Sequence, residues 1–159
     1  MGKDSKLKVP GWSLVLVFII LLAFFAYKEA NALEIEGGPG LLSGEYSEGA
    51  AVMITESIGK FDLGGGYVSH QVCHCTWPAH LESNIFFQAQ RILEYKAAEI
   101  GIGAAYWQNT NRALGKNLTW SLSLGVGGEH WSIRLRHYSN AGSGRPNLGQ
   151  DMLTLGYSF

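Results

Sequence analysis

Charged residues and proline are scarce in this sequence, and each shortage argues against a class of protein. Only 16% of the 159 residues are charged, whereas an ordinary soluble domain has about 25%. The 12 Lys and Arg nearly balance the 13 Asp and Glu, so no basic field exists and nucleic acid is not an expected partner. Four Pro are too few for a disordered linker protein. Gly is abundant at 21 residues, about twice its usual share. This composition favours a β-rich, membrane-associated chain.

One long apolar run lies close to the N-terminus. It extends from Trp12 to Tyr27 without a charge, follows three lysines and precedes an Ala-Asn-Ala sequence that ends at Ala32. A basic start, an apolar stretch and small residues before a cleavage point are typical of a secretory signal peptide. We therefore expect residues 1–32 to be a signal peptide. The alternative is an uncleaved anchor, for which the run is slightly shorter than the about 20 residues of a full span.

Residues 33–159 contain no second apolar segment of helical length. If this region spans a membrane it must be a closed β-barrel, because no other lipid-exposed fold satisfies its backbone. Turn residues divide it into eight candidate strands of about 10 residues each, which is long enough to cross a bilayer. The expected strands are Leu33–Leu42, Ala50–Ile58, Phe61–Cys73, Asn84–Leu93, Ala97–Trp107, Leu118–Val126, His130–Tyr138 and Asp151–Phe159. The first is the weakest, because Pro39 removes a hydrogen-bond donor from the ladder.

The connections between these strands alternate in length. Long connections are expected at Ser43–Gly49, His74–Ser83, Gln108–Asn117 and Ser139–Gln150, and short ones at Gly59-Lys60, Glu94–Lys96 and Gly127–Glu129. Bacterial outer-membrane barrels have long loops outside and tight periplasmic turns. The sequence therefore predicts an all-β, eight-stranded antiparallel barrel in the outer membrane, with the long loops at the cell surface.

Near the C-terminus apolar and small polar residues alternate strictly. Leu153, Leu155, Tyr157 and Phe159 share one parity, whereas Thr154, Gly156 and Ser158 share the other. An apolar face and a polar face suit the lipid side and the filled interior of a small barrel. The terminal Phe also resembles the C-terminal signal of outer-membrane proteins.

Three chemically active residues fall on the lipid parity of the last two strands. His137 and Ser139 continue the odd positions of Trp131, Ile133 and Leu135, and Asp151 has the odd parity of the final strand. Polar groups that face lipid are costly and need a reason. One interpretation is a polar collar at the membrane interface. The other is a serine-hydrolase triad, in which the histidine takes the serine proton and the carboxylate orients the imidazole.

The same stretch resembles a known family. HYSNAG at 137–142 and PNxGxD at 146–151 are similar to the signature of the lipid A 3-O-deacylases of the PagL type, which are eight-stranded outer-membrane barrels. The resemblance implies an esterase that cuts the ester-linked acyl chain at position 3 of lipid A, the anchor of lipopolysaccharide. It assigns the catalytic roles to Ser139, His137 and Asp151. The family acid is usually Glu, so Asp151 is one methylene shorter.

The resemblance also implies an oxyanion site, with Gly142 and either Asn140 or Asn147 as candidate donors. An Asn- and Gly-containing loop can turn donors toward a developing oxyanion, although these residue types also suit plain turns. The expected substrate is lipid A of the outer leaflet. No cofactor and no metal are expected, and the oligomeric state is left open, a homodimer included.

Other charged and metal-ligating residues have alternative interpretations. Arg134 and Arg136 lie on the inward parity, so we expect interior ion pairs with partners such as Glu56, Asp62 or Glu99. Loop cations are either lipid A phosphate contacts or solvated charge: Arg112, Lys116 and Arg145. A second cluster consists of His70, Cys73, His74, Cys75 and His80. One interpretation is a zinc site, because Cys73 and Cys75 on one strand face could both reach a metal, but the spacing matches no standard zinc pattern. We therefore expect free or intermolecularly paired thiols.

Two rival functions share much of this pattern. A non-enzymatic structural or adhesive barrel accounts for the export signal, the strands and the terminal Phe, but not for outward-facing His137, Ser139 and Asp151. A soluble, secreted β-sandwich that binds a ligand would fractionate without detergent. The sequence therefore favours the esterase.

Overall fold

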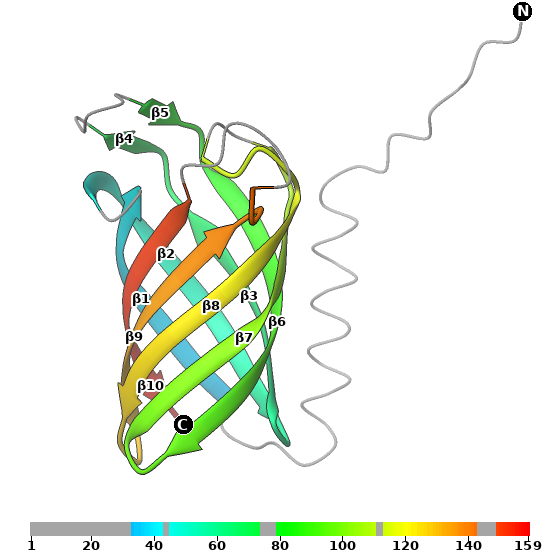
Figure 1. Ribbon diagram of the computed structural model, residues 1–159. Coiled ribbons are helices and arrows are strands. Elements are labelled where there is room, and N and C mark those ends of the chain that lie inside the picture. The colour runs from blue at the N-terminus through cyan, green and yellow to red at the C-terminus, as the bar shows by residue number, and fades with distance from the viewer. Residues whose placement is uncertain (1–32, 43–44, 74–78, 111–112, 143–148) are drawn as a thin grey trace, which may run out of the picture. The chain divides into compact units, whose positions relative to one another are not determined.

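Eight long antiparallel strands close into a barrel in the computed structural model, which describes residues 33–42, 45–73, 79–110, 113–142 and 149–159 (Figure 1). The barrel strands are β1 (Leu33–Leu42), β2 (Glu45–Ile58), β3 (Phe61–Val68), β6 (Asn84–Tyr95), β7 (Ala98–Trp107), β8 (Leu118–Gly127), β9 (Trp131–Ser139) and β10 (Gln150–Ser158). β1 pairs with both β2 and β10, which closes the sheet. The predicted fold class is confirmed, and the expected signal peptide, residues 1–32, lies outside the described residues.

No helix that is long and apolar enough to cross a membrane occurs in the part of the chain that the structure describes.

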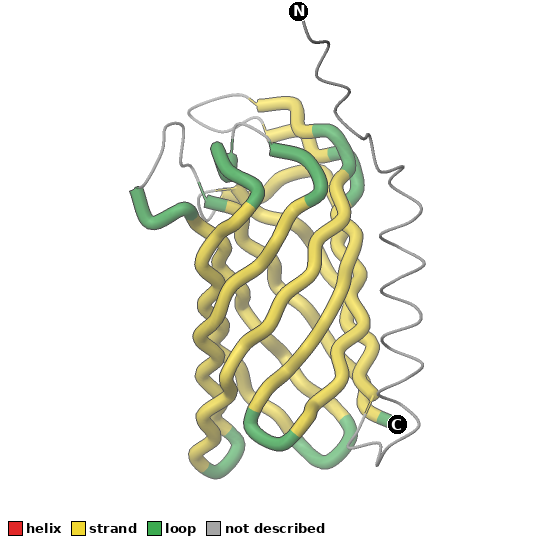
Figure 2. The backbone as a smooth tube through the Cα atoms, turned by 90° about the vertical axis from the view of Figure 1, so that its right-hand side faces the viewer, coloured by secondary structure: helices red, strands yellow, loops and turns green. Residues whose placement is uncertain are grey.

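The two ends of the barrel differ in the length of their connections. Short turns follow β2, β6 and β8 at one end, and the longer connections, together with the small hairpin of β4 (Gln71–Cys73) and β5 (Ala79–Leu81), lie at the other (Figure 2). Positive φ angles at Gly59 and Lys96 allow two of the short turns to reverse the chain tightly. The predicted alternation is present except between β1 and β2, and we call the end with the longer connections the loop end.

Two expected element boundaries were wrong. β2 begins at Glu45, where it pairs with Leu42, so Ser43–Gly49 is not a long loop. The pairing continues past Pro39 because the register shifts between Pro39 and Leu41, and such a bulge accommodates the missing donor. The expected strand Phe61–Cys73 is divided, because β3 ends at Val68 opposite Asn84, the first residue of β6.

Apolar side chains form a band around the outside of the barrel. On β10, Leu155 is 62% exposed, whereas its neighbour Thr154 is 2% exposed and points inward. The same alternation continues on β8 and β9. The predicted parity is therefore correct for these strands, and the outer band is the surface that lipid would cover.

A charge placed on this band should destabilise the barrel. We expect Leu155→Arg to lower the free energy of unfolding in lipid by about 2–4 kcal/mol, because the guanidinium would lie near the bilayer midplane. Thr154→Ser is the matched control on the inward face and should be nearly neutral, since serine keeps the hydroxyl that donates to Glu36 Oε2 at 2.6 Å. Urea unfolding in lipid vesicles measures both, and a larger loss for Thr154→Ser would show the parity to be reversed.

Ion pairs fill the interior toward the short-turn end. Arg134 contacts Glu34 at 2.6 Å, Glu36 at 3.1 Å and Glu99 at 2.7 Å, and Arg136 pairs with Glu36. Glu99 was predicted, but the sequence did not indicate the two β1 carboxylates. They reach β9 across β10 because the intervening inward residue there is Gly156, where a Cβ would collide with Glu34.

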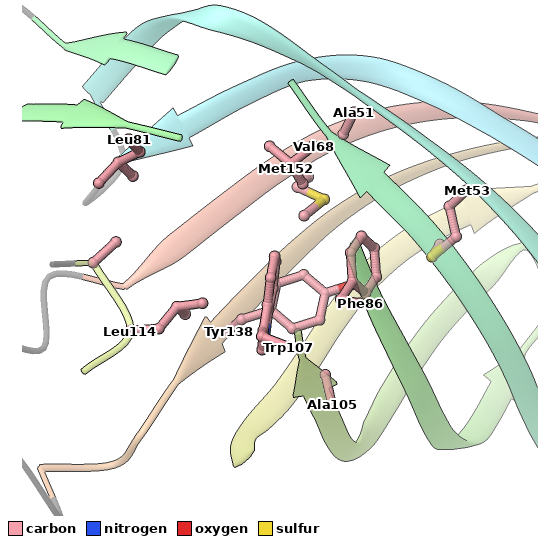
Figure 3. Close-up of a cluster of buried hydrophobic side chains, with 11 residues drawn as sticks. Ala51, Met53, Val68, Leu81, Phe86, Ala105, Trp107, Leu114, Tyr138 and Met152 are labelled. Atoms are coloured by element: carbon pink, nitrogen blue, oxygen red, sulfur yellow. The ribbon is translucent and has the colours of Figure 1, made fainter. Parts of the chain in front are cut away.

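Apolar residues fill the interior toward the loop end. Phe86 and Trp107 stack with their ring centroids 4.7 Å apart, and the Tyr138 ring packs edge-on against both (Figure 3). Leu114, from the β7–β8 connection, is fully buried in the same cluster. This cluster holds the end of β9 from the inside, and that end carries the candidate catalytic residues on the outside.

Candidate active site

The alternation of inward and outward side chains continues to the end of β9 and places His137 and Ser139 on the outer face. Their neighbours Arg136 and Tyr138 are fully buried in the interior, and Tyr138 donates its hydroxyl hydrogen to Gln88 Oε1 at 2.7 Å. Because successive strand residues point to opposite faces, two anchored inward side chains set the direction of the two outward ones. The strand thus presents the imidazole and the hydroxyl on a rigid element.

The side chains of His137 and Asp151 are hydrogen-bonded to one another. They are direct partners in the β9–β10 pairing, and His137 Nδ1 lies 2.6 Å from Asp151 Oδ1. The imidazole is 47% exposed, but the carboxylate is only 12% exposed although it has the outward parity. A covered carboxylate makes an electrostatically stronger hydrogen bond than a solvated one. This geometry orients the ring and directs Nε2 away from the acid.

Ser139 is the last residue of β9, on the same face as His137 and about 6.6 Å further along the strand. Its Oγ accepts a hydrogen bond from the Ala141 N–H at 3.1 Å. The half-buried hydroxyl therefore lies beside the backbone of the turn that follows. The structure brings two of the three predicted catalytic residues into contact and places the third on the same face.

The turn after Ser139 contains two of the three oxyanion candidates. Asn140 is buried; its Nδ2 donates to the Leu114 carbonyl at 2.8 Å and its Oδ1 accepts from the Gly142 N–H at 3.0 Å. Ala141 and Gly142 both have positive φ, 51° and 76°, so the backbone departs from the extended strand conformation directly after Asn140. The Asn140 side chain therefore connects this turn to the β7–β8 connection through hydrogen bonds. Asn147 lies outside the described residues.

Strand pairing adds residues to the site that the sequence did not indicate. On β8, Trp120 is the partner of Ser139 and Leu122 is the partner of His137, and both side chains are exposed on the outer face, Trp120 by 63%. Directly opposite residues have Cβ atoms about 4.5–5.5 Å apart. An apolar wall thus flanks the serine and the histidine on the β8 side. The alternation of β8 fixed the outward direction of these residues, but only the register shows which of them lie opposite the site.

The model of one protein family matches most of the region just described. The family is described as lipid A 3-O-deacylase (PagL), and the match covers residues 76–159, which is 84 of the 159 residues. The chain belongs to the PagL family. The matched region contains His137, Ser139 and Asp151, and the outer-membrane location that the sequence predicted for this PagL-family barrel is confirmed.

A solved structure has the same fold. The crystal structure of the outer membrane enzyme PagL matches with a TM-score of 0.53 and 20% sequence identity, and the match covers 81% of this chain and 99% of that chain. At this identity the likeness shows the shared barrel fold. No curated protein matches the sequence.

Some sequence predictions stay predictions in this PagL-family chain. In the Cys–His cluster, Cys73 pairs with Ala79 in the β4–β5 hairpin, but His74 and Cys75 lie outside the described residues. Among the loop cations only Lys116 lies in the described part of the chain, where it is exposed. Contacts of these loop residues with lipid A phosphates are therefore not tested.

Proposed function

We propose that this protein is an esterase that removes the ester-linked acyl chain at position 3 of lipid A with a Ser139–His137–Asp151 triad. The observation that carries the proposal is the 2.6 Å contact between His137 Nδ1 and Asp151 Oδ1 on the outer face of the barrel, two residues from Ser139. An imidazole held through Nδ1 by a carboxylate has its other nitrogen available to act as a base. Membership of the PagL family supports the choice of lipid A as substrate.

The proposed reaction proceeds in two halves. Ser139 Oγ attacks the ester carbonyl carbon while His137 Nε2 takes its proton, and Asp151 stabilises the resulting imidazolium. The tetrahedral intermediate collapses when the imidazolium returns that proton to the leaving sugar oxygen. Water then attacks the acyl-serine while the same imidazole takes a proton from it. As the bond between the acyl carbon and Ser139 Oγ breaks, the imidazolium gives that proton to Oγ. The products are a lipid A with a free hydroxyl at position 3 and a fatty acid, and the enzyme returns to its starting protonation state.

Stabilisation of the oxyanion is assigned to the residues that follow the nucleophile in the sequence. Asn140 and Gly142, in the turn after Ser139, are candidates, and Asn147 is the third. The Gly142 N–H donates to Asn140 Oδ1, so its use as an oxyanion donor would require it to exchange this partner when substrate binds. A single such donor typically contributes about 10²–10³-fold to the rate.

The position of the site on the barrel suits a lipid substrate. His137 and Ser139 face outward at the loop end, next to the apolar residues Trp120 and Leu122. With the loop end at the cell surface, this level is near the headgroup boundary of the outer leaflet, where the ester bonds of lipid A lie. Acyl chains would pack along the apolar band below, and the released fatty acid would leave sideways through the lipid.

Mass spectrometry of lipid A tests the proposal directly. Membranes that contain the protein should yield lipid A lighter by one 3-linked acyl chain, together with the free fatty acid, whereas membranes without it should not. Unchanged lipid A in the presence of the folded barrel would contradict the proposal and favour a structural role.

The acid of the triad offers a graded test. Asp151→Asn should lower the deacylation rate by about 10²–10⁴-fold, because it favours the wrong tautomer of His137 and removes a charge. Asp151→Glu restores the residue usual in the family, yet we expect it to lower the rate by about tenfold, corresponding to ~1.4 kcal/mol. The backbone already places the shorter acid at 2.6 Å, and the extra methylene must fit into a covered position. Deacylation rates in detergent micelles measure both, and a faster Asp151→Glu enzyme would show that the backbone suits the longer acid.

A further inference from the structure

Gly149 lies against the imidazole of His137. A Cβ at this position would be 2.8 Å from His137 Cε1, 3.5 Å from Nδ1 and 3.7 Å from Nε2. The first distance is shorter than a carbon–carbon contact permits. Gly149 also has a φ of +79°, which non-glycine residues adopt rarely. The missing side chain therefore leaves the space that the ring occupies.

The backbone at Gly149 cannot easily retreat from the ring. Its N–H donates to the Ala113 carbonyl at 3.0 Å, and Ala113 is fully buried in the apolar cluster at the loop end. The next residue, Gln150, begins β10 and pairs with both Tyr138 and Leu42. With the chain held on both sides, a side chain at position 149 would displace the imidazole rather than the backbone.

Ala113 and its neighbour Leu114 also support the part of the site that contains Ser139. The Leu114 carbonyl accepts a hydrogen bond from Asn140 Nδ2, and Asn140 directly follows Ser139. Ala113 is thus hydrogen-bonded to Gly149, which lies against the His137 ring, and Leu114 is hydrogen-bonded to Asn140, which follows Ser139. Their burial in the barrel interior connects both contacts to the packed core.

We infer that Gly149 is a positioning residue, which holds the His137 ring at the distance from Asp151 that the reaction needs, with Ala113–Leu114 as its support. The inference rests on the proposed function, because it assigns His137 the role of the base. Displacement of a catalytic group by about 1 Å can cost about 10²-fold in rate. Loss of the 2.6 Å contact with Asp151 is the expected consequence of such a displacement.

The first experiment compares substitutions at two glycines in the full-length protein. Gly149→Ala and Gly149→Asn should lower kcat for lipid A deacylation by about 10²-fold and change KM by less than about threefold. They should slow the labelling of Ser139 by a fluorophosphonate to a similar extent. Gly59→Ala and Gly59→Asn are the controls: Gly59 has a φ of +63°, nothing lies within 4 Å of its Cβ position, and it is in a turn at the other end of the barrel. Asparagine tolerates positive φ, so Gly149→Asn adds the same Cβ with less backbone strain.

A second experiment separates positioning from a general structural role. In an Asp151→Asn background, where the orienting contact is already lost, Gly149→Ala should cost less than about threefold, because both changes act through the same ring. Equal cost in both backgrounds would overturn the inference. Labelling of Ser139 at the wild-type rate in the Gly149→Ala variant would also overturn it. The same holds if both Gly149 variants fail to reach the heat-modifiable folded form while both Gly59 variants reach it. Ser139→Ala tests the proposed function separately: if it stays active, the triad is wrong, whereas an inactive Ser139→Ala with an unaffected Gly149→Ala contradicts the positioning role alone.

Discussion

Replacement of Ser139 by alanine should leave a folded barrel that no longer deacylates lipid A. The substitution removes one hydroxyl from the outer face, and water can replace it as the acceptor for the N–H of the exposed residue Ala141. His137→Asn should have the same effect, because the serine loses its base. Loss of a nucleophile or a base of this kind typically costs at least about 10³-fold in rate. Mass spectrometry of lipid A from membranes that carry each variant measures the result.

Folding and specificity have separate controls in this experiment. Heat-modifiable mobility on gels reports whether each barrel is folded. Ser158→Ala is the matched control, since Ser158 is the last residue of β10 at the end of the barrel opposite the site, and it should keep full activity. A folded Ser139→Ala protein that still releases the 3-linked acyl chain at the original rate would refute the triad and leave a structural barrel as the better explanation.

The largest effect on stability is expected at Glu36. This carboxylate is fully buried and contacts both Arg134 and Arg136, and it also accepts hydrogen bonds from Thr154 at 2.6 Å and Thr55 at 3.4 Å. Glu36→Gln would leave two buried guanidinium groups without their shared counter-charge. Breaking a buried ion pair by removal of one partner typically costs about 3–5 kcal/mol, and we expect a loss in this range, measured by urea unfolding in lipid vesicles.

Glu99→Gln is the matched control for this stability prediction. Glu99 contacts only Arg134 among the described ion pairs, and its side chain is 18% exposed, so water can replace part of the lost interaction. Its substitution should cost clearly less than that of Glu36. Equal losses at the two positions would show that the shared contact with both arginines does not set the stability of the interior.

The placement of the candidate catalytic residues was predictable because the relevant structure is local. Strict alternation on β9 placed His137 and Ser139 on one face from the sequence alone, and β9 and β10 are consecutive strands that pair directly. The sequence therefore predicted, without the register, that Asp151 at the start of β10 lies near His137 and Ser139 at the end of β9. Gly149, by contrast, was only the glycine of the PNxGxD motif, and the sequence assigned it no role of its own. Its relation to the His137 ring depends on a hydrogen bond to Ala113, which no local pattern indicates.

The sequence by itself determined the all-β class, the lipid and interior faces of the last strands, and the three catalytic candidates, because a period of two and the order of the strands are properties of neighbouring residues. Closure of the barrel decided the rest. Glu34 and Glu36 meet Arg134 across about 100 positions of sequence only because β1 pairs with β10. The burial of Ala113 and Leu114 likewise depends on how the β7–β8 connection packs over the core. Contacts between segments so far apart follow from which strands become neighbours, and that is a property of the whole sheet and not of any single segment.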